Sequence, residues 1–495
     1  MTHGHVETHD RASLRPEYLI VCYFPMKHIL PIIILLTIFR SGLLAQSGPS
    51  GFDLAFDKKA KEVSIVTCAE NGFCVVTESK SRKIHTLAVV HADTAMRTVW
   101  DTVLSVPQNW QVSRVFHEDG TLILLCRHLQ GKRMTDSLSV LLYHTVSRKL
   151  ETRDVVLGLP GDAVAADWHY YHGNLLFSSK AKSTDGVWYL PAGFNTPFQF
   201  TFTRENPGRV LSLDVDTTNA MAVIVFNSGS RTMYFETDFQ GKSSFANVIG
   251  EPATQAQWIP VSRNHSVLML YFHDNENFMM HPVNILNHKV MPSDTLFCAD
   301  INVPKTDPTE AKVKRTIIVV PYNYVRFFPT YAGCLGDKIF CVTELYSLEY
   351  SNYFNGWYVE PRFEGYRYER ADVHFFDTNG VFRTNLTFPY GEDSPLRTNV
   401  YKVLNVKGLP NGDILLYHLD SRTLTTMLLD DACALKSPVS STDLPMLGPA
   451  YSGRYKTVPG AMQWWYGNSF LLTAYRMNPG SQRKVGLLVR KMEYN

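Results

Sequence analysis

Four cysteines in the sequence have a spacing that suits disulfide chemistry. Cys68 and Cys74 flank a Glu-Asn-Gly turn in TCAENGFCVV, so they face each other across an antiparallel hairpin if the loop holds three residues. Cys334 and Cys341 repeat this arrangement in GCLGDKIFCV, where direct opposition needs a turn at residues 337–338. Both pairs are therefore disulfide candidates, and the alternative for each is a pair of buried free thiols in strands.

The same cysteines do not have the spacing of a zinc site. Such sites commonly combine C-x2-C pairs with similar Cys or His pairs, and the sequence contains neither pattern around these residues. Cys126, Cys298 and Cys433 have no evident partner in the sequence. We therefore expect no metal ion and no cofactor.

One acidic motif resembles the Asp box of sialidase-type propellers, S-x-D-x-G-x-T-W. It is KSTDGVWYL, which matches through Ser183, Asp185, Gly186 and Trp188 but is one residue short and lacks the Thr. Because the motif occurs once, whereas those enzymes repeat it across their blades, the sequence favours a structural hairpin turn.

Two other clusters of polar residues have side chains of the kinds that bind metals or transfer protons. LDVDTTNA offers oxygen ligands but lacks the further oxygens and the Gly of a calcium loop, so a plain hairpin turn is favoured. DWHYYHGN carries histidines that its counterpart QWWYGN lacks, so a packing role is favoured. The side chains concerned are Asp214, Asp216, Asn219, Asp167, His169 and His172. No nucleophile elbow or Gly-rich phosphate loop occurs, and we expect no catalytic residue.

The stretch from Tyr346 to Arg370 has the composition of a contact surface. It places nine aromatic rings within 25 residues, together with several Glu and Arg. Tyr, Trp and Arg are the residues enriched at interaction hot spots. We interpret the stretch as an insertion that replaces a short hairpin connection, and the alternative is a small satellite core on the flank of a blade. The predicted binding residues are Tyr353, Trp357, Tyr358, Arg362, Phe363, Tyr366 and Arg367.

The elements that must position these residues are short strands. Turn signals are followed by apolar runs eight times, as in ENGFCVVTE, EDGTLILLCRH and PNGDILLYHLD. Most intervals between the turns are 45 to 55 residues long, a period typical of the blades of a β-propeller. The turns fall near Gly72, Gly120, Gly173, Asn219, Asn264, Gly336, Gly412 and Gly467.

The two ends of this repeat predict how the ring closes. Residues 62–104 divide into four strands, around 64–67, 74–78, 84–90 and 97–102, whereas the last unit shows only three strands. The segment GFDLAFD, residues 51–57, is predicted to be the missing outer strand. We therefore predict an all-β, eight-bladed propeller closed by an N-terminal strand. Seven blades are the first alternative, and a pair of two-sheet sandwiches is the second.

From residue 51 to 495 the chain resembles the secreted bacterial β-propellers of the broad WD40-like or YVTN-like kind. The resemblance rests on the period and on the paired aromatics before an identical Gly-Asn turn in DWHYYHGNLLFSSK and QWWYGNSFLLTAYR. The chain lacks the GH and WD signatures of WD40 repeats and the double-Gly motif of kelch repeats. The resemblance thus implies an architecture and carries over no catalytic residue.

The N-terminal region has the order of a secretory signal peptide. MKHILPIIILLTIFRSGLLAQ begins at Met26, continues through an apolar block of eleven residues and reaches a small residue at Ala45. This block is too short for a membrane-spanning helix, which needs about 20 residues. We expect a signal peptide at 26–45, with a short buried helix as the alternative. Residues 1–25 are interpreted as an extension from a start codon placed too early, and residues 46–495 as one propeller domain with its insertion at 346–370.

The charge composition argues against one class of function, nucleic-acid binding. The formal net charge is +2 and the basic residues are spread along the chain, so no nucleic-acid partner is expected. We expect an exported protein, periplasmic, on the cell surface or extracellular, without a transmembrane anchor in its mature form. Its expected role is a non-enzymatic scaffold that binds a protein or an envelope glycan. The alternatives are a polysaccharide hydrolase or lyase with carboxylates converging at the channel mouth, and a component of an outer-membrane secretion or surface assembly.

Overall fold

The computed structural model describes residues 44–45, 51–55 and 60–494, apart from short gaps. The gaps are 81–84, 132, 162, 183, 194–195, 201, 203–207, 243, 273–276, 292–295, 299–324, 355–358, 391–396, 398–401, 421–422, 444–454 and 479–483. The predicted signal peptide lies outside the described residues except for β1 (Leu44–Ala45), which pairs with the last strand. None of the described residues belongs to an apolar helix of the length that a bilayer requires.

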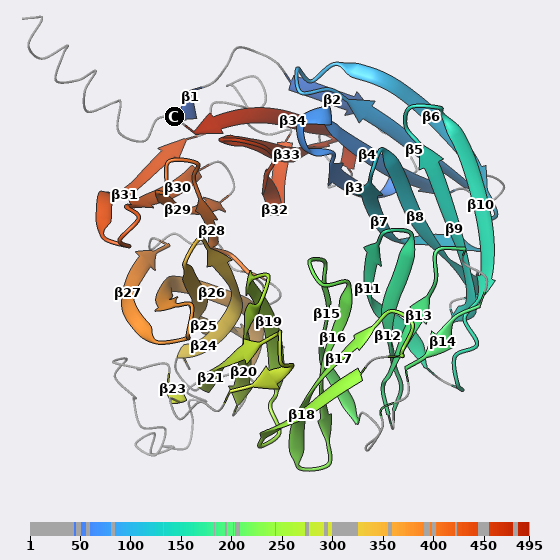
Figure 1. Ribbon diagram of the computed structural model, residues 1–495. Coiled ribbons are helices and arrows are strands. Elements are labelled where there is room, and N and C mark those ends of the chain that lie inside the picture. Colours follow the sequence, from blue (N-terminus) through green and yellow to red (C-terminus); the bar gives the residue numbers. More distant parts are fainter. Residues whose placement is uncertain are drawn as a thin grey trace, which may run out of the picture.

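Eight antiparallel sheets are arranged in a ring, which Figure 1 shows in a view down the ring. Each sheet is one blade, built on a meander in which three or four strands that follow one another in the chain are hydrogen-bonded neighbours. The chain is therefore an eight-bladed β-propeller, as the sequence predicted. A single 3-10 helix, η1 (Ala69–Asn71), is the only helix among the described residues.

The first four blades have four strands each. Blade 1 contains β3 (Ala60–Thr67), β4 (Phe73–Lys80), β5 (His85–Ala92) and β6 (Thr98–Val106). Blade 2 contains β7 (Trp110–Glu118), β8 (Thr121–Gln130), β9 (Arg133–His144) and β10 (Lys149–Val156). Blade 3 contains β11 (Val164–Tyr171), β12 (Asn174–Lys180), β13 (Gly186–Leu190) and β14 (Phe198–Gln199). Blade 4 contains β15 (Arg209–Asp216), β16 (Met221–Ser228), β17 (Arg231–Asp238) and β18 (Ser244–Gly250).

The other four blades complete the ring. Blade 5 contains β19 (Gln255–Ser262), β20 (His265–Phe272), β21 (Asn277–Asn284), β22 (Lys289–Val290) and β23 (Leu296–Cys298). Blade 6 contains β24 (Val325–Leu335), β25 (Lys338–Phe354), β26 (Val359–Asp377) and β27 (Phe382–Pro389). Blade 7 contains β28 (Asn405–Gly408), β29 (Ile414–Asp420), β30 (Thr423–Leu429) and β31 (Leu435–Asp443). Blade 8 contains β32 (Tyr455–Trp464), β33 (Ser469–Met477), β34 (Lys484–Tyr494) and β2 (Gly51–Ala55).

The apolar pattern of each strand follows from its place in the blade. The second strand is covered on both faces, so six consecutive residues from the start of β4 are all buried. The fourth strand is at the periphery, and β6 accordingly alternates between exposed and more buried residues over much of its length. Eight clusters of buried side chains fill the spaces between the blades, and each cluster combines residues from two neighbouring blades.

Strand β2 closes the ring by pairing with β34 of the last blade. The register runs antiparallel from Gly51 opposite Arg490 to Ala55 opposite Gly486. Phe52 is 5% exposed and packs edge-on against Phe73 of blade 1, with ring centroids 5.6 Å apart. The predicted N-terminal closing strand is thus confirmed, and the seven-bladed and sandwich alternatives are wrong because eight separate sheets form the ring.

We expect Phe52→Ala to lower the free energy of unfolding by about 3 kcal/mol or more, because it removes a buried ring from the closing contact. Urea unfolding of the variant and the parent protein measures this. Asp53→Ala is the matched control on the exposed face of the same strand, where loss of the surface ion pair with Arg476 should cost less than about 1 kcal/mol. Equal losses in the two variants would contradict the closure role of Phe52.

Candidate binding site: an aromatic ribbon and a basic pocket

The meander order of each blade gives the ring two distinct ends. Because successive strands are antiparallel, the turns from the first to the second strand all lie at one end. The connections from the second to the third strand, and those that lead from one blade to the next, lie at the other end, which we call the ribbon end. The eight Gly and Asn turns found in the sequence belong to the opposite end, which we call the turn end.

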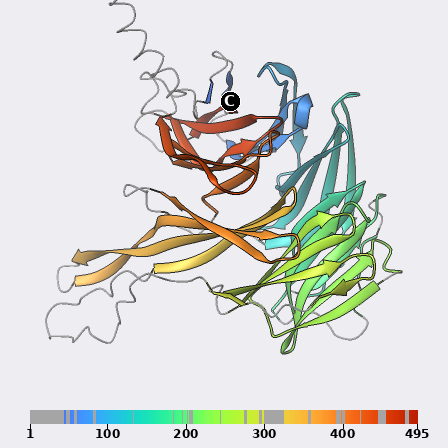
Figure 2. The same cartoon turned by 60° about the vertical axis from the view of Figure 1, so that its left-hand side comes forward.

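The aromatic stretch forms a long β-ribbon at the ribbon end. Strands β25 and β26 pair from Lys338 opposite Asp377 to Phe354 opposite Val359. Their outer neighbours stop earlier, since β24 reaches only Ser347 and β27 only Arg370. The two-stranded part therefore extends about 23 Å beyond the blade, and Figure 2 shows it projecting away from the ring.

The stretch is thus a continuation of two blade strands and not an irregular loop. Residues 355–358, which include the predicted binding residues Trp357 and Tyr358, lie outside the described residues. The rings of the described part differ in exposure: Tyr346 and Tyr368 are buried at the base, whereas Phe363 is 41% and Tyr353 is 52% exposed.

One face of the ribbon carries a continuous row of rings. Tyr346 packs edge-on against Tyr366 at 5.3 Å, and Tyr366 packs against Phe363 at 5.0 Å. Phe363 in turn contacts Tyr350 at 5.5 Å. The row starts in the buried core between blades 6 and 7, where Tyr368 lies, and ends on exposed rings. The satellite-core alternative therefore describes the base of the ribbon and fails toward its tip.

The predicted arginines lie on the other face of the ribbon. Arg367 pairs with Ser347 in the register, between Tyr366 and Tyr368 in the sequence, so its side chain points away from the rings. Its Nε lies 2.9 Å from Glu349 Oε1. Arg362 is exposed on the same face as Arg367, 4.0 Å from Glu364. The sheet therefore separates both arginines from Phe363 and Tyr366, whereas Tyr353 lies on the same face as the arginines.

Arg397 braces the ribbon near its base through an isolated β-bridge. Tyr366 and Arg397 exchange two backbone hydrogen bonds, of 2.7 and 2.9 Å, and the Arg397 side chain reaches Asp420 of blade 7 at 3.1 Å. Gly365 permits this approach, because its φ is +151° and a Cβ would lie 2.6 Å from the Arg397 carbonyl oxygen. The ribbon therefore leaves the ring in a fixed direction.

A buried carboxyl group anchors the base of the ribbon to blade 7. Glu344 of β25 is 0% exposed, and its Oε1 accepts backbone N–H bonds of 2.9 Å from both Val403 and Leu404. Its Oε2 accepts the hydroxyl of Tyr390. Burial raises the pKa of Glu344 to about 7, although these hydrogen bonds act in the opposite direction.

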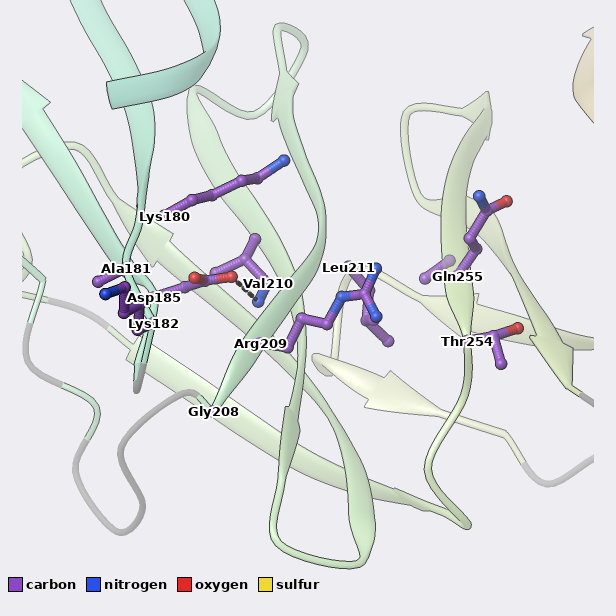
Figure 3. A pocket seen from close by; sticks show the side chains of 11 residues that line it. Lys180, Ala181, Lys182, Asp185, Gly208, Arg209, Val210, Leu211, Thr254 and Gln255 are labelled. Carbon is purple, nitrogen blue, oxygen red and sulfur yellow. Dashed lines mark hydrogen bonds between the residues drawn. The ribbon is translucent and has the colours of Figure 1, made fainter. Parts of the chain in front are cut away.

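A basic pocket of about 520 Å³ opens at the same end of the ring, between blades 3, 4 and 5 (Figure 3). Lys180 and Lys182 come from blade 3, Arg209 from the start of β15, and Thr254 and Gln255 from the start of blade 5. Three cationic side chains and one carboxylate line the pocket, so it favours an anionic group.

The single carboxylate in this pocket belongs to the motif that resembles an Asp box. Asp185 Oδ2 accepts a 2.9 Å hydrogen bond from Val210 N of the next blade. Gly186 is buried where a Cβ would meet Ser179 Oγ at 2.8 Å, and Trp188 Nε1 donates to that same hydroxyl at 2.9 Å. The motif thus holds blades 3 and 4 together, in agreement with the structural interpretation.

The remaining polar clusters divide between turns and the inner strands. Asp216 accepts bonds from the backbone N–H groups of Thr218 and Asn219, as expected of a plain hairpin turn. Asp214 and His169 lie on adjacent inner strands and influence each other electrostatically. Burial raises the pKa of Asp214 and lowers the pKa of His169, so both groups are driven toward their neutral forms. The spacing of Asp214 and His169 in the sequence does not predict that the two side chains lie close together.

The cysteine hairpins are both shifted from their predicted registers. Cys74 pairs with Val66, so Cys68 is not directly opposite it, yet the two Sγ atoms are only 3.7 Å apart. Cys341 pairs with Ala332 because the second turn falls at residues 336–337 instead of 337–338. All four thiols are free in the structure, and a disulfide between Cys334 and Cys341 stays a prediction.

Comparison with known proteins adds little to this description. No family model matches the chain, and no curated protein sequence matches it. Among solved structures, it is similar to a Synechocystis apocarotenoid oxygenase mutant, with 11% identity and a TM-score of 0.34, over 48% of this chain and 61% of that one. It is similar to the β-propeller domain of the Trilobed protease from Pyrococcus furiosus, with 8% identity and a TM-score of 0.35, over 78% and 96% of the two chains.

A third similar structure is Hsv2 of Kluyveromyces lactis, with 9% identity and a TM-score of 0.38. The match covers 78% of this chain and 100% of Hsv2. The match covers 61% of the oxygenase chain, so this chain spans about three fifths of the oxygenase's length. At these scores the neighbours carry no argument about activity, and the eight sheets themselves show the fold.

We expect the stability of the protein to fall as the pH rises from about 4.5 to 7, in part because of Glu344. Its folded pKa of about 7 lies above the unfolded value, so the folded chain binds more protons in this window. The contribution is on the order of 3 kcal/mol, present below the window and lost above it. Urea unfolding at several pH values measures it.

Glu344→Gln is the matched variant for this test. Its amide oxygen can accept both N–H bonds and its amide nitrogen can donate to Tyr390, so the hydrogen bonds persist without a titrating group. The difference in stability between the two proteins should therefore change across the window. A constant difference from pH 5 to pH 8 would contradict the raised pKa.

Proposed function

We propose that this β-propeller is an exported, non-enzymatic binding module that holds a protein partner on the ribbon of blade 6. The observation that carries the proposal is the projecting ribbon with its row of exposed rings. A two-stranded ribbon in water has little stability of its own. Because the ribbon adds little to the stability of the blade, we infer that its function is to contact a partner. Export is supported by the signal-like segment at 26–45 and by the resemblance to secreted bacterial propellers.

The ribbon favours a protein partner over a glycan because of its open edges. Within the described residues, β25 beyond Ser347 pairs only with β26. Before Arg370, β26 pairs with β25, bonds Arg397 at Tyr366 and accepts one backbone hydrogen bond from Tyr390 at Glu369. Such edges present backbone donors and acceptors to which an extended peptide can add as a strand. The rings would cover apolar side chains of that peptide, whereas a glycan would use the rings and leave the edges unused.

The basic pocket extends the contact surface at the same end of the ring. Arg209 and Lys182 are exposed there, and Lys180 already forms a 2.9 Å ion pair with Asp167. A partner with acidic side chains would therefore bind faster and more tightly at low salt than at high salt. An outer-membrane secretion or surface assembly would be one setting for such a module.

We expect Tyr350→Ala combined with Phe363→Ala to weaken partner binding by about 2 kcal/mol or more, the range of interface hot spots. The rings are 39% and 41% exposed, so stability should change little. A photo-crosslinker at position 353 in the native cell envelope identifies the partner, and calorimetry with the purified partner measures the affinity. Trp357→Ala and Tyr358→Ala are expected to act in the same direction.

Phe382→Ala is the control for this variant. Phe382 is a similarly exposed ring, at 43%, on the outer strand of the same blade and outside the ribbon. Unchanged affinity in the ribbon variant, or an equal loss in the Phe382 control, would contradict the proposal. Binding on a glycan array that depends on the same two rings would replace the protein partner with a sugar.

One observation favours the enzymatic alternative, a polysaccharide hydrolase or lyase. Asp214 and His169 form a pair of groups with opposed pKa shifts near the central axis, an arrangement that can transfer protons. Activity assays on a panel of acidic and neutral polysaccharides test this. Turnover by the parent protein that disappears in both Asp214→Asn and His169→Gln would support the enzymatic alternative. No turnover by the parent protein would favour the binding module.

A further inference from the structure

Two thiols and one imidazole of blade 1 meet at the turn end of the ring, on the side that packs against blade 2. Cys68 follows β3, Cys74 lies on β4 and His91 lies on β5, and their ligand atoms are all within 4.8 Å of one another. His117 lies on β7 of blade 2, close enough to Cys68 to interact with it electrostatically, but outside the group of three whose ligand atoms lie within 4.8 Å of one another. Cys74, His91 and His117 lie on three different strands and Cys68 lies on the turn after a fourth, so no local sequence pattern brings them together.

The separation of the two sulfur atoms fits a shared metal ion. In a tetrahedral zinc site with Zn–S bonds of about 2.3 Å, two sulfur ligands lie about 3.8 Å apart. The observed Sγ–Sγ distance is 3.7 Å. A disulfide would instead require about 2.05 Å. The thiols are thus spaced as two corners of a coordination tetrahedron.

The orientation of His91 is a second and independent indication. Its Nε2 lies 2.9 Å from the carbonyl oxygen of Asn71, so Nε2 carries the proton and donates it there. Nδ1 is then an unprotonated acceptor, and it is buried without any hydrogen-bond partner. Metal-binding histidines usually donate one ring N–H to a backbone carbonyl or carboxylate, which leaves the other ring nitrogen free to bind the metal.

We propose that Cys68, Cys74, His91 and His117 bind one Zn²⁺ ion in a structural Cys2His2 site. Both cysteines bind as thiolates, and the two thiol protons pass to solvent, so the occupied site is neutral. Zinc suits a tetrahedral set of two sulfur and two nitrogen ligands, whereas Ca²⁺ and Mg²⁺ prefer oxygen. Four protein ligands leave no open position, which makes the role structural and not catalytic.

The site would tie blade 1 to blade 2 beside the ring closure. Cys68 and Cys74 enclose η1 and Gly72, and the Gly72 carbonyl accepts a 3.0 Å hydrogen bond from Trp465 Nε1 of blade 8. Gly72 is required there, because its φ is +109° and a Cβ would lie 1.9 Å from the Ala92 carbonyl oxygen. One hairpin therefore contacts blade 8 on one side and carries the ligands shared with blade 2 on the other.

The test begins with the metal content of the full chain, purified without chelators or added metal and measured by mass spectrometry. We expect about one zinc per chain, and loss of most of it in Cys74→Ser and in His91→Ala. Cys126→Ala is the matched control, since Cys126 is equally buried in the same core cluster but is not among the proposed ligands. It should keep its zinc.

Cobalt substitution gives a second readout that does not depend on how well each cysteine variant folds. Co²⁺ added to the zinc-depleted protein should give thiolate-to-metal absorption and the intense visible bands of a tetrahedral ion, and His117→Ala should weaken them. Zinc removal should also lower Tm, and added Zn²⁺ should restore it. A metal-free protein with a Cys68–Cys74 disulfide, or free thiols that bind no Co²⁺, would overturn the proposal.

Discussion

The antiparallel pairing of β2 with β34 is the contact on which the rest of the molecule depends. The described core is not a single interior but eight separate clusters, each made by the facing sides of two neighbouring blades. Each blade therefore needs two neighbours, and only a closed ring gives every sheet both of them. Phe52, Phe73 and Trp465 meet at this junction, with centroids of successive rings 5.6 Å apart. Their edge-on packing joins the first and last segments of the ring.

The closed ring is rigid, and the ribbon extends from it. The strands of the ribbon are also the two central strands of blade 6, so its direction is set by a sheet with buried faces on both sides. Glu344 adds a polar anchor that would cost stability if its buried oxygens lacked partners, and three donors bond to the two oxygens. The exposed rings therefore need no contribution to folding, and their side chains are available for contact.

The sequence predicted the repeat and its closure because both leave local traces. A turn followed by an apolar run marks the second strand of each blade. GFDLAFD has the pattern of a strand but lies before the first complete blade, so it is available to pair with the last one. The ribbon leaves a local trace too, because Tyr346, Leu348 and Tyr350 alternate with Ser347 and Glu349 at the period of a strand. Charge and aromatic content alone favour an inserted connection and do not show on which face the arginines lie. Period two places the arginines on the face opposite the row of rings.

Sites built from several strands leave no such trace, and the cysteine cluster shows why. Cys68 and Cys74 are separated by five residues, but His91 reaches them only because β5 pairs with β4 and places it opposite Cys74, and His117 comes from β7 of the next blade. A search by ligand spacing therefore finds no zinc motif where the structure brings Cys68, Cys74 and His91 together. The cluster lies at the turn end and the rings at the ribbon end, with no shared side chains. Metal bound at the first would act on the second only through the stability of the ring as a whole.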